Sequence, residues 1–267
     1  GALARRAAGA DWITMADNPR AIARPDGVSL SILINALTRV PVIPHLACRD
    51  RNELSLRAAL SALDVAGFRE ILVVTGDPVR DEDRGRIAPC SGLCAADLAS
   101  KIPEWAEGGF SRGFSVSAAL NVNARNFGAE LARAERKIRN GVCRLFTQPV
   151  LSPTALANLA QARSALDCEI FGGILPVVSS RNAEFLANGI PGIRIGDEVR
   201  ERYRGLDREA TASLAVELSL EFSREMSGFV DGLYLITPFR RIDIVETILQ
   251  GLRADEEACG QKKACGL

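Results

Sequence analysis

Polar side chains suited to ligand binding or proton transfer follow short apolar runs along most of the chain. His45 comes directly after such a run, Asp77 follows a second run after Thr75 and Gly76, and Gln148 follows a third. A carboxylate can stabilise a positive charge that develops during a reaction, and a buried amide requires hydrogen-bond partners. The pattern therefore predicts a polar site for a small molecule. The clusters are Thr14 and Asp17; His45, Arg49 and Asp50; Thr75 and Asp77; Asn121 and Asn123; Thr147 and Gln148; Ser179 and Arg181; Thr237 and Arg240.

Several other kinds of site are excluded by residue types. The chain has one histidine, so the HExxH motif and two-histidine metal sites are impossible. Neither GxxxxGK[ST] nor GxGxxG is present, which removes the two common phosphate-binding loops. The seven cysteines are an odd, scattered set without a zinc spacing. We expect structural thiols and no metal site.

The composition is that of a globular protein in a reducing compartment. Hydrophobic residues make up 47% and charged residues 25% of the chain, and Lys+Arg and Asp+Glu are equal at 33 each. This balance gives no support for nucleic-acid binding. No apolar run approaches the roughly 18 residues of a membrane span, and no signal peptide opens the chain. We expect a cytoplasmic protein.

Apolar runs alternate with amphipathic segments, which predicts parallel strands separated by helices. The apolar stripe Leu56, Leu60 and Leu63, for example, ends at Gly67, a typical helix stop. The expected strands are 12–15, 40–44, 71–74, 114–119, 144–146, 170–175 and 232–236. The expected helices include 52–66, 126–140, 211–226 and 242–252.

Two α/β architectures contain such a pattern: the TIM barrel and the open, doubly wound sheet. An open sheet concentrates its ligand groups at one switch point, whereas polar clusters here follow nearly every strand. We therefore predict a (β/α)8 TIM barrel over residues 1–253, with a loosely ordered tail over 254–267. Only seven of the eight strands are evident.

A series of short segments resembles the methylenetetrahydrofolate reductase family in order and spacing. The resemblance runs from about residue 9 to about 252 and is closest to short bacterial reductases and to the reductase half of homocysteine methyltransferase–reductase fusions. The segments are ITMADNP (13–19), PHLACRDRN (44–52), VVTGDP (73–78), ALNVNARN (119–126), FTQPV (146–150), GGILPVVSSRNAEFL (172–186) and YLITPFRR (234–241).

The beginning of the chain departs from the family pattern. Family members start with a strand that carries a glutamate, thought to be the general acid that protonates the folate. Residues 1–9 instead resemble the helix after that strand. We therefore expect the barrel's first strand and its glutamate to be missing from this sequence.

Asp77 and His45 each have two explanations, a structural one and a functional one that the resemblance implies. Asp77 could simply form a turn after its Gly. In the family the matching carboxylate is catalytic, stabilising the 5-iminium cation of the folate, and also lies beside the flavin. His45 could be a structural histidine at a strand end, and the resemblance implies contact with the flavin ring edge or ribityl chain.

The segment 126–140 carries a charged stripe beside its apolar face. Glu130, Arg133 and Lys137 are spaced three and four residues apart, so they share one side of a helix. A solvated salt-bridge stripe is the ordinary explanation. The resemblance implies that Arg133, Arg136 and Lys137 bind the flavin phosphates and Glu130 the ribose, although Arg136 lies off the stripe.

The remaining site residues rest on the resemblance. Thr14 would lie beside the flavin, and Ala95 would contact it through its backbone. Gln148 would hydrogen-bond the pterin, and Leu186 would cover the substrate, although core packing explains it as well. Arg240 is a further candidate for substrate binding.

The implied activity is flavin-dependent interconversion of 5,10-methylenetetrahydrofolate and 5-methyltetrahydrofolate. The cofactor would be FAD, with FMN as the alternative, reduced by NAD(P)H or a partner electron carrier. We expect a homo-oligomer. Two alternatives remain: one domain of a homocysteine methyltransferase–reductase, and a flavin- or pterin-binding subunit without reductase activity.

Overall fold

In the part of the chain that the structure describes, seven strands form the central sheet. The computed structural model describes residues 10–38, 40–90, 92–107, 113–189, 192–238 and 241–264. Within this part the strands follow chain order in the sheet, and the pairs β1–β2, β2–β3, β3–β4 and β6–β7 are parallel. The strands are β1 (Ile13–Met15), β2 (Val42–Ala47), β3 (Glu70–Val74), β4 (Ser115–Leu120), β5 (Val142–Pro149), β6 (Glu169–Ile174) and β7 (Gly232–Leu235).

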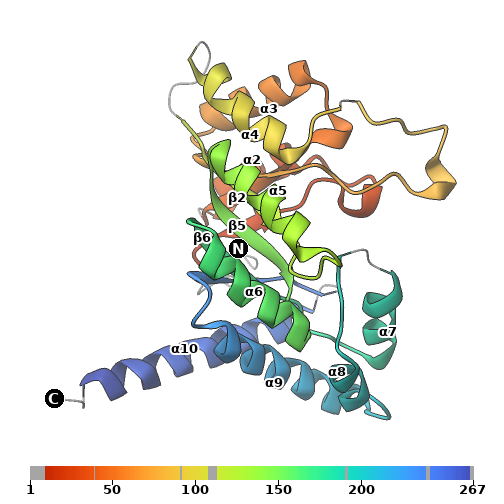
Figure 1. Cartoon of the computed structure of the whole chain (residues 1–267), viewed down its shortest axis with the longest axis vertical. Coiled ribbons are helices and arrows are strands. Elements are labelled where there is room, and N and C mark those ends of the chain that lie inside the picture. Colours follow the sequence, from red (N-terminus) through yellow and green to blue (C-terminus); the bar gives the residue numbers. More distant parts are fainter. Residues whose placement is uncertain are drawn as a thin grey trace. The chain divides into compact units, whose positions relative to one another are not determined.

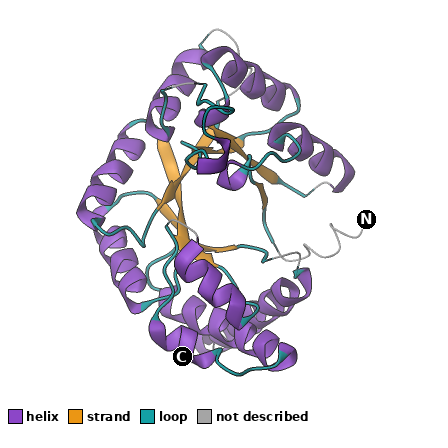
Figure 2. Ribbon diagram, turned by 90° about the vertical axis from the view of Figure 1, so that its right-hand side faces the viewer, coloured by secondary structure: helices purple, strands orange, loops and turns teal. Residues whose placement is uncertain are grey.

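Every connection between consecutive strands contains a helix (Figures 1 and 2). Parallel strands in chain order with helical connections define an α/β fold of the TIM-barrel type, as the sequence predicted. The helices are α2 (Gly27–Thr38), α3 (Glu53–Val65), α4 (Ala95–Ala106), α5 (Phe127–Arg139), α6 (Pro153–Ala165), α7 (Ser180–Gly189), α8 (Asp197–Arg202), α9 (Arg208–Met226) and α10 (Ile242–Ala264).

The strand boundaries differ from the expected ones where polar residues continue a strand. Strand β2 extends to Ala47 and pairs His45 with Leu72 of β3, so the histidine lies within the strand. Strand β5 extends to Pro149 and contains Gln148. The expected strands were too short because the apolar pattern ends before these polar residues, whereas the strands of the structure continue through them. The helix expected to end at Leu252 continues to Ala264.

The chain folds into two compact units. The first comprises Gly1–Ala119 and Ala132–Leu145, within the limits of the described residues. Its core includes the predicted stripe of α3, since Leu56, Leu60 and Leu63 are fully buried. Helix α3 begins where the Asn52 side chain accepts a hydrogen bond from the Ser55 N–H at 2.9 Å.

The second unit comprises Leu120–Leu131 and Phe146–Leu267, again within the described residues. The ring of Phe146 in β5 lies 5.2 Å from those of Phe171 in β6 and Tyr234 in β7. Helices α9 and α10 pack side by side, with Ala215 against Ile244 and Ile248. Across the described residues, no helix is both long and apolar enough to cross a membrane.

Candidate functional site

The turn after β3 presents Asp77 at the surface of the first unit. Gly76 has a φ of +96°, and a Cβ added there would lie 2.7 Å from the Cβ of Arg49. Only glycine fits both constraints. The exposed Asp77 carboxylate accepts a hydrogen bond from the Arg20 N–H at 2.5 Å, and its carbonyl oxygen accepts one from Arg49 at 2.7 Å. The turn therefore holds the carboxylate in one place.

Arg49 ties together the loops that follow β1, β2 and β3. Its guanidinium is buried, forms an ion pair with Asp50 at 2.5 Å and donates to the Asn18 carbonyl at 3.2 Å. Burial raises the pKa of Asp50, but hydrogen bonds from Arg49 and Asn18 outweigh it, so the net pKa lies below its usual value. Asp50 is therefore a fixed negative charge.

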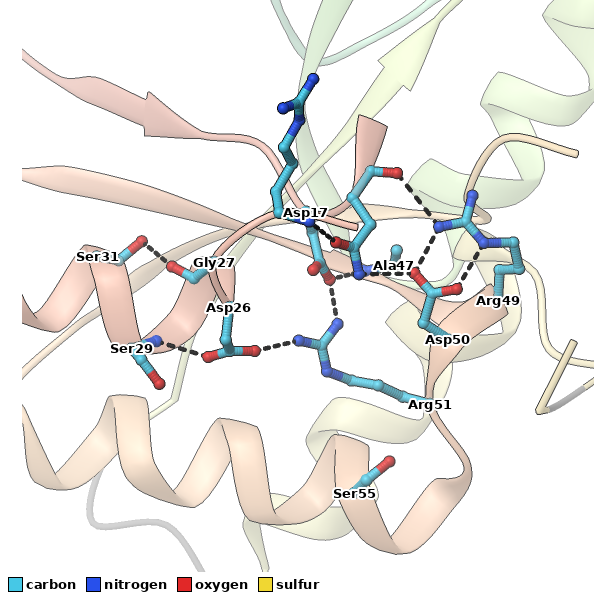
Figure 3. A network of polar contacts seen from close by, with 12 residues as sticks. Asp17, Asp26, Gly27, Ser29, Ser31, Ala47, Arg49, Asp50, Arg51 and Ser55 are labelled. Atoms are coloured by element: carbon cyan, nitrogen blue, oxygen red, sulfur yellow. Dashed lines mark hydrogen bonds and ion pairs between the residues drawn. The ribbon is translucent and has the colours of Figure 1, made fainter. Parts of the chain in front are cut away.

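A second ion-pair network fixes the loop after β1 (Figure 3). The buried Asp17 carboxylate accepts from the Ala47 N–H at 2.9 Å and forms an ion pair with Arg51. Arg51 also pairs with Asp26 at 2.9 Å, and Asp26 in turn accepts from the Ser29 N–H at 2.8 Å. These partnered charges make a rigid support for the loop.

His45 is a titratable residue of this region whose Nε2 is buried. The residue as a whole is half-buried. Its Nε2 atom is buried and has no hydrogen-bond partner among the described residues. Burial lowers the pKa of His45 to about 4, because the charged imidazolium loses its hydration. The ring is therefore neutral at physiological pH.

The first unit brings Ala95 and Arg136 to the same end of α4. The Ala95 N–H donates to the Thr75 hydroxyl at 3.1 Å, which joins α4 to the end of β3. Arg136 forms an ion pair with Asp97 in the first turn of α4 at 2.5 Å. Its position off the charged stripe of α5 is thus explained, because it faces α4.

Helix α5 carries the other charged residues named by the sequence. Arg133 is exposed, and the half-buried Lys137 donates to the Ala119 carbonyl at 2.6 Å. Glu130 belongs to the second unit, where it is buried and accepts from the Asn121 N–H at 3.0 Å. Because Glu130 is buried, a purely solvated salt-bridge stripe does not describe this helix.

Gln148 lies half-buried near the end of β5 in the second unit. The neighbouring Thr147 hydroxyl accepts from the Gly173 N–H at 2.8 Å. A Cβ on Gly173 would lie 2.6 Å from the Thr147 carbonyl oxygen, so β6 approaches β5 closely at this point. The backbone that carries Gln148 is therefore tightly constrained.

A cavity of about 520 Å³ lies in the second unit beside α7. Phe185 and the arginines Arg181 and Arg241 contribute an aromatic surface and two positive charges, and Arg241 pairs with Asp243 at 2.7 Å. The lining residues are Val178, Ser179, Arg181, Asn182, Phe185 and Arg241. The lining therefore combines guanidinium groups with an aromatic ring.

The cavity contains residues that sequence reasoning missed. Arg241 was passed over in favour of Arg240, which lies outside the described residues. The FRR sequence was the available signal, but it could not show which arginine faces a cavity. Leu186 is only 3% exposed, which agrees with a packing role.

The predicted residues are distributed between the two units. The first holds Thr14, in β1, together with His45, Asp77, Ala95, Arg133, Arg136 and Lys137. The second holds Glu130, Gln148 and Leu186. In the described ranges, no group of three or more His, Cys, Asp or Glu residues is arranged to hold a metal ion.

The fold defines a TIM-barrel-type α/β protein with polar residues at several strand ends. An uncharacterised protein from Clostridium thermocellum, described as binding two copies of 5-methyl-5,6,7,8-tetrahydrofolic acid, has a similar fold: the TM-score is 0.63 at 16% identity, covering 92% of this chain and 84% of that one. DmoA from Hyphomicrobium sulfonivorans is also similar, with a TM-score of 0.52 at 13% identity and coverages of 96% and 81%. No curated protein sequence matches.

The sequence assigns the family. The model of the methylenetetrahydrofolate reductase family matches residues 2–252, and the chain therefore belongs to that family. This confirms the resemblance seen in the sequence and supports a folate-related oxidoreductase function.

Proposed function

We propose that this protein is a flavin-dependent oxidoreductase that interconverts 5,10-methylenetetrahydrofolate and 5-methyltetrahydrofolate. The observation that carries the proposal is the family match over residues 2–252. The Clostridium thermocellum protein, described as binding 5-methyltetrahydrofolic acid, supports a folate substrate. FAD is the proposed cofactor, with NAD(P)H or a partner electron carrier as its reductant.

The residues of the first unit fit a flavin. The Nε2 of His45 is buried and has no partner among the residues that the structure describes, and the low pKa of the imidazole keeps it neutral. The helix α5 residues Arg133, Arg136 and Lys137 supply positive charge for the phosphates. A bound flavin would supply the hydride-transfer chemistry, and these residues would hold and orient the flavin.

Asp77 would act on the folate rather than on the hydride donor. Its carboxylate is exposed at the surface of the unit and fixed by the Arg20 N–H. A fixed negative charge stabilises a cation more than a mobile one, because no reorganisation is needed as the charge develops. We assign Asp77 the stabilisation of the 5-iminium cation.

The cavity beside α7 would receive the acidic tail of the folate. Arg181 and Arg241 offer guanidinium groups that match carboxylates, and Phe185 offers an apolar surface for the aromatic part. Arg241 already pairs with Asp243, so a substrate carboxylate would compete for it. Gln148 of β5 is the residue proposed to bind the pterin.

Anaerobic addition of 5-methyltetrahydrofolate to the flavin-loaded protein tests the proposal. The flavin absorption should decrease as the folate is oxidised. Arg181→Ala and Arg241→Ala should each raise the folate concentration that gives half-maximal reduction of the flavin. The expected increase is roughly 10-fold or more, the scale of a charged hydrogen bond. Arg224→Ala, whose side chain is exposed and paired with Asp255, is the control. No change in absorption with any reduced folate would contradict the proposal.

A further inference from the structure

Asn123 is a buried side chain whose hydrogen bonds are incomplete. It lies in the loop between β4 and α5 and is 5% exposed. Its Nδ2 donates to the Pro149 carbonyl at 3.0 Å. Since a carbonyl oxygen only accepts, the amide must turn its NH2 towards Pro149. The Oδ1 is then buried, with no partner among the described residues.

The bond to Pro149 acts on the backbone next to Gln148. Pro149 directly follows Gln148 at the end of β5. On the β6 side, a Cβ on Gly173 would lie 3.0 Å from the Gln148 carbonyl oxygen, and the Val150 N–H donates to the Gly173 carbonyl at 3.0 Å. The peptide groups around Gln148 are therefore held by Asn123 and by Gly173.

The loop that carries Asn123 is itself fixed by two helices. Glu130 of α5 accepts from the Asn121 N–H at 3.0 Å, and the Asn121 side chain accepts from the Asn123 N–H at 3.0 Å. Asn158 of α6 donates to the Val122 carbonyl at 2.7 Å. Asn123 thus extends from a rigid support, as a group that positions another residue must.

We propose that Asn123 is a positioning residue that fixes the Gln148 amide for the pterin of the folate. The inference rests on the proposed function, in which Gln148 binds that pterin. A buried acceptor without a donor is unfavourable for folding, and such exceptions occur where function requires them. Positioning Gln148 would be such a function. The hydrogen bond from Asn123 to the Pro149 carbonyl fixes the backbone of β5 next to Gln148, and this backbone sets the direction of the Gln148 side chain.

A double-mutant cycle with Gln148→Ala tests whether Asn123 acts through Gln148. Asn123→Asp keeps the side-chain shape but replaces the donor towards Pro149 by an acceptor. Binding of 5-methyltetrahydrofolate to the flavin-loaded protein would be measured by calorimetry. Asn123→Asp should weaken it by about 10-fold, the scale of one hydrogen bond. In the Gln148→Ala background the same change should have almost no further effect, since coupled residues are not additive.

Three further measurements separate positioning from a general loss of structure. Flavin affinity and flavin reduction by the nicotinamide should be unchanged in Asn123→Asp. Asn123→Ser, whose hydroxyl can still donate, should retain more of the folate affinity than Asn123→Ala. Ser219→Ala removes another buried side-chain-to-carbonyl hydrogen bond of the second unit, to Ala215 in α9, and should leave folate binding within about 2-fold.

The inference would be overturned by unchanged folate affinity in Asn123→Asp and Asn123→Ala, or by the same loss of affinity in both Gln148 backgrounds. If wild type binds folate but Gln148→Ala binds equally well, Gln148 has no pterin role and the inference is wrong while the folate function stands. If wild type binds no reduced folate, the proposed function itself is wrong.

Discussion

Replacing Asp77 by Asn tests whether its negative charge serves the folate half of the reaction. The variant keeps a side-chain oxygen for the Arg20 N–H, so the turn should persist. A preorganised electrostatic group contributes about 2–4 kcal/mol to a transition state. Because Asp77 is exposed, water screens its charge, and we expect the lower value of about 2 kcal/mol. This corresponds to roughly 30-fold slower reaction of the folate.

Stopped-flow measurement of the two half-reactions is the assay. Oxidation of the reduced flavoprotein by 5,10-methylenetetrahydrofolate should slow, whereas reduction by the nicotinamide should change little, because no cation of the folate forms there. Asp81→Asn, an exposed acid of the same loop paired with Arg84, is the matched control and should leave both rates unchanged. Equal slowing of both halves by Asp77→Asn would refute the electrostatic role and leave only the shaping of the turn.

Three further changes test the surroundings of the site. With the pKa of His45 lowered from 6.5 to about 4, the folded state is fully stabilised above pH 6.5 and loses stability as the pH falls towards 4, because the unfolded chain binds the proton first. An NMR titration of the chain's single imidazole should have its midpoint near pH 4, and a midpoint near pH 6.5 would contradict the lowered pKa. Gly76→Ala should destabilise the protein by about 2–4 kcal/mol in denaturant unfolding, since backbone strain and displacement of Arg49 add. Gly85→Ala, with positive φ but open space, should cost about 1 kcal/mol, and equal losses would refute the steric argument. Lys137→Ala should weaken flavin binding by about 1–3 kcal/mol, while Arg139→Ala on the same helix should not; equal affinities would make Lys137 a surface lysine.

The sequence predicted the strands because they are short apolar runs, and their order followed from the alternation with helices. It placed the ends poorly where polar residues continue a strand. His45 and Gln148 were expected to follow their strands, yet both lie within them, because backbone pairing does not depend on side-chain polarity. The extension of α10 to Ala264 was missed for a related reason, since its last turns show little apolar periodicity.

The candidate site was only partly predictable for a different reason. Asp77 and Gln148 stand out in sequence because polar residues after apolar runs are visible there. Asn123 was noticed only as part of a cluster, because its role depends on the carbonyl of a residue 26 positions away. Arg241 could not be distinguished from its neighbour until the cavity was seen. Such residues are defined by three-dimensional contacts that no local pattern encodes.

The absorption spectrum of the purified protein, before and after incubation with FAD and FMN, tests the central claim most directly. A flavin-dependent folate reductase should show the bands of a bound oxidised flavin that remains with the protein through gel filtration. Mass analysis of the released cofactor then distinguishes FAD from FMN. A protein that stays colourless after incubation with both flavins would contradict the account.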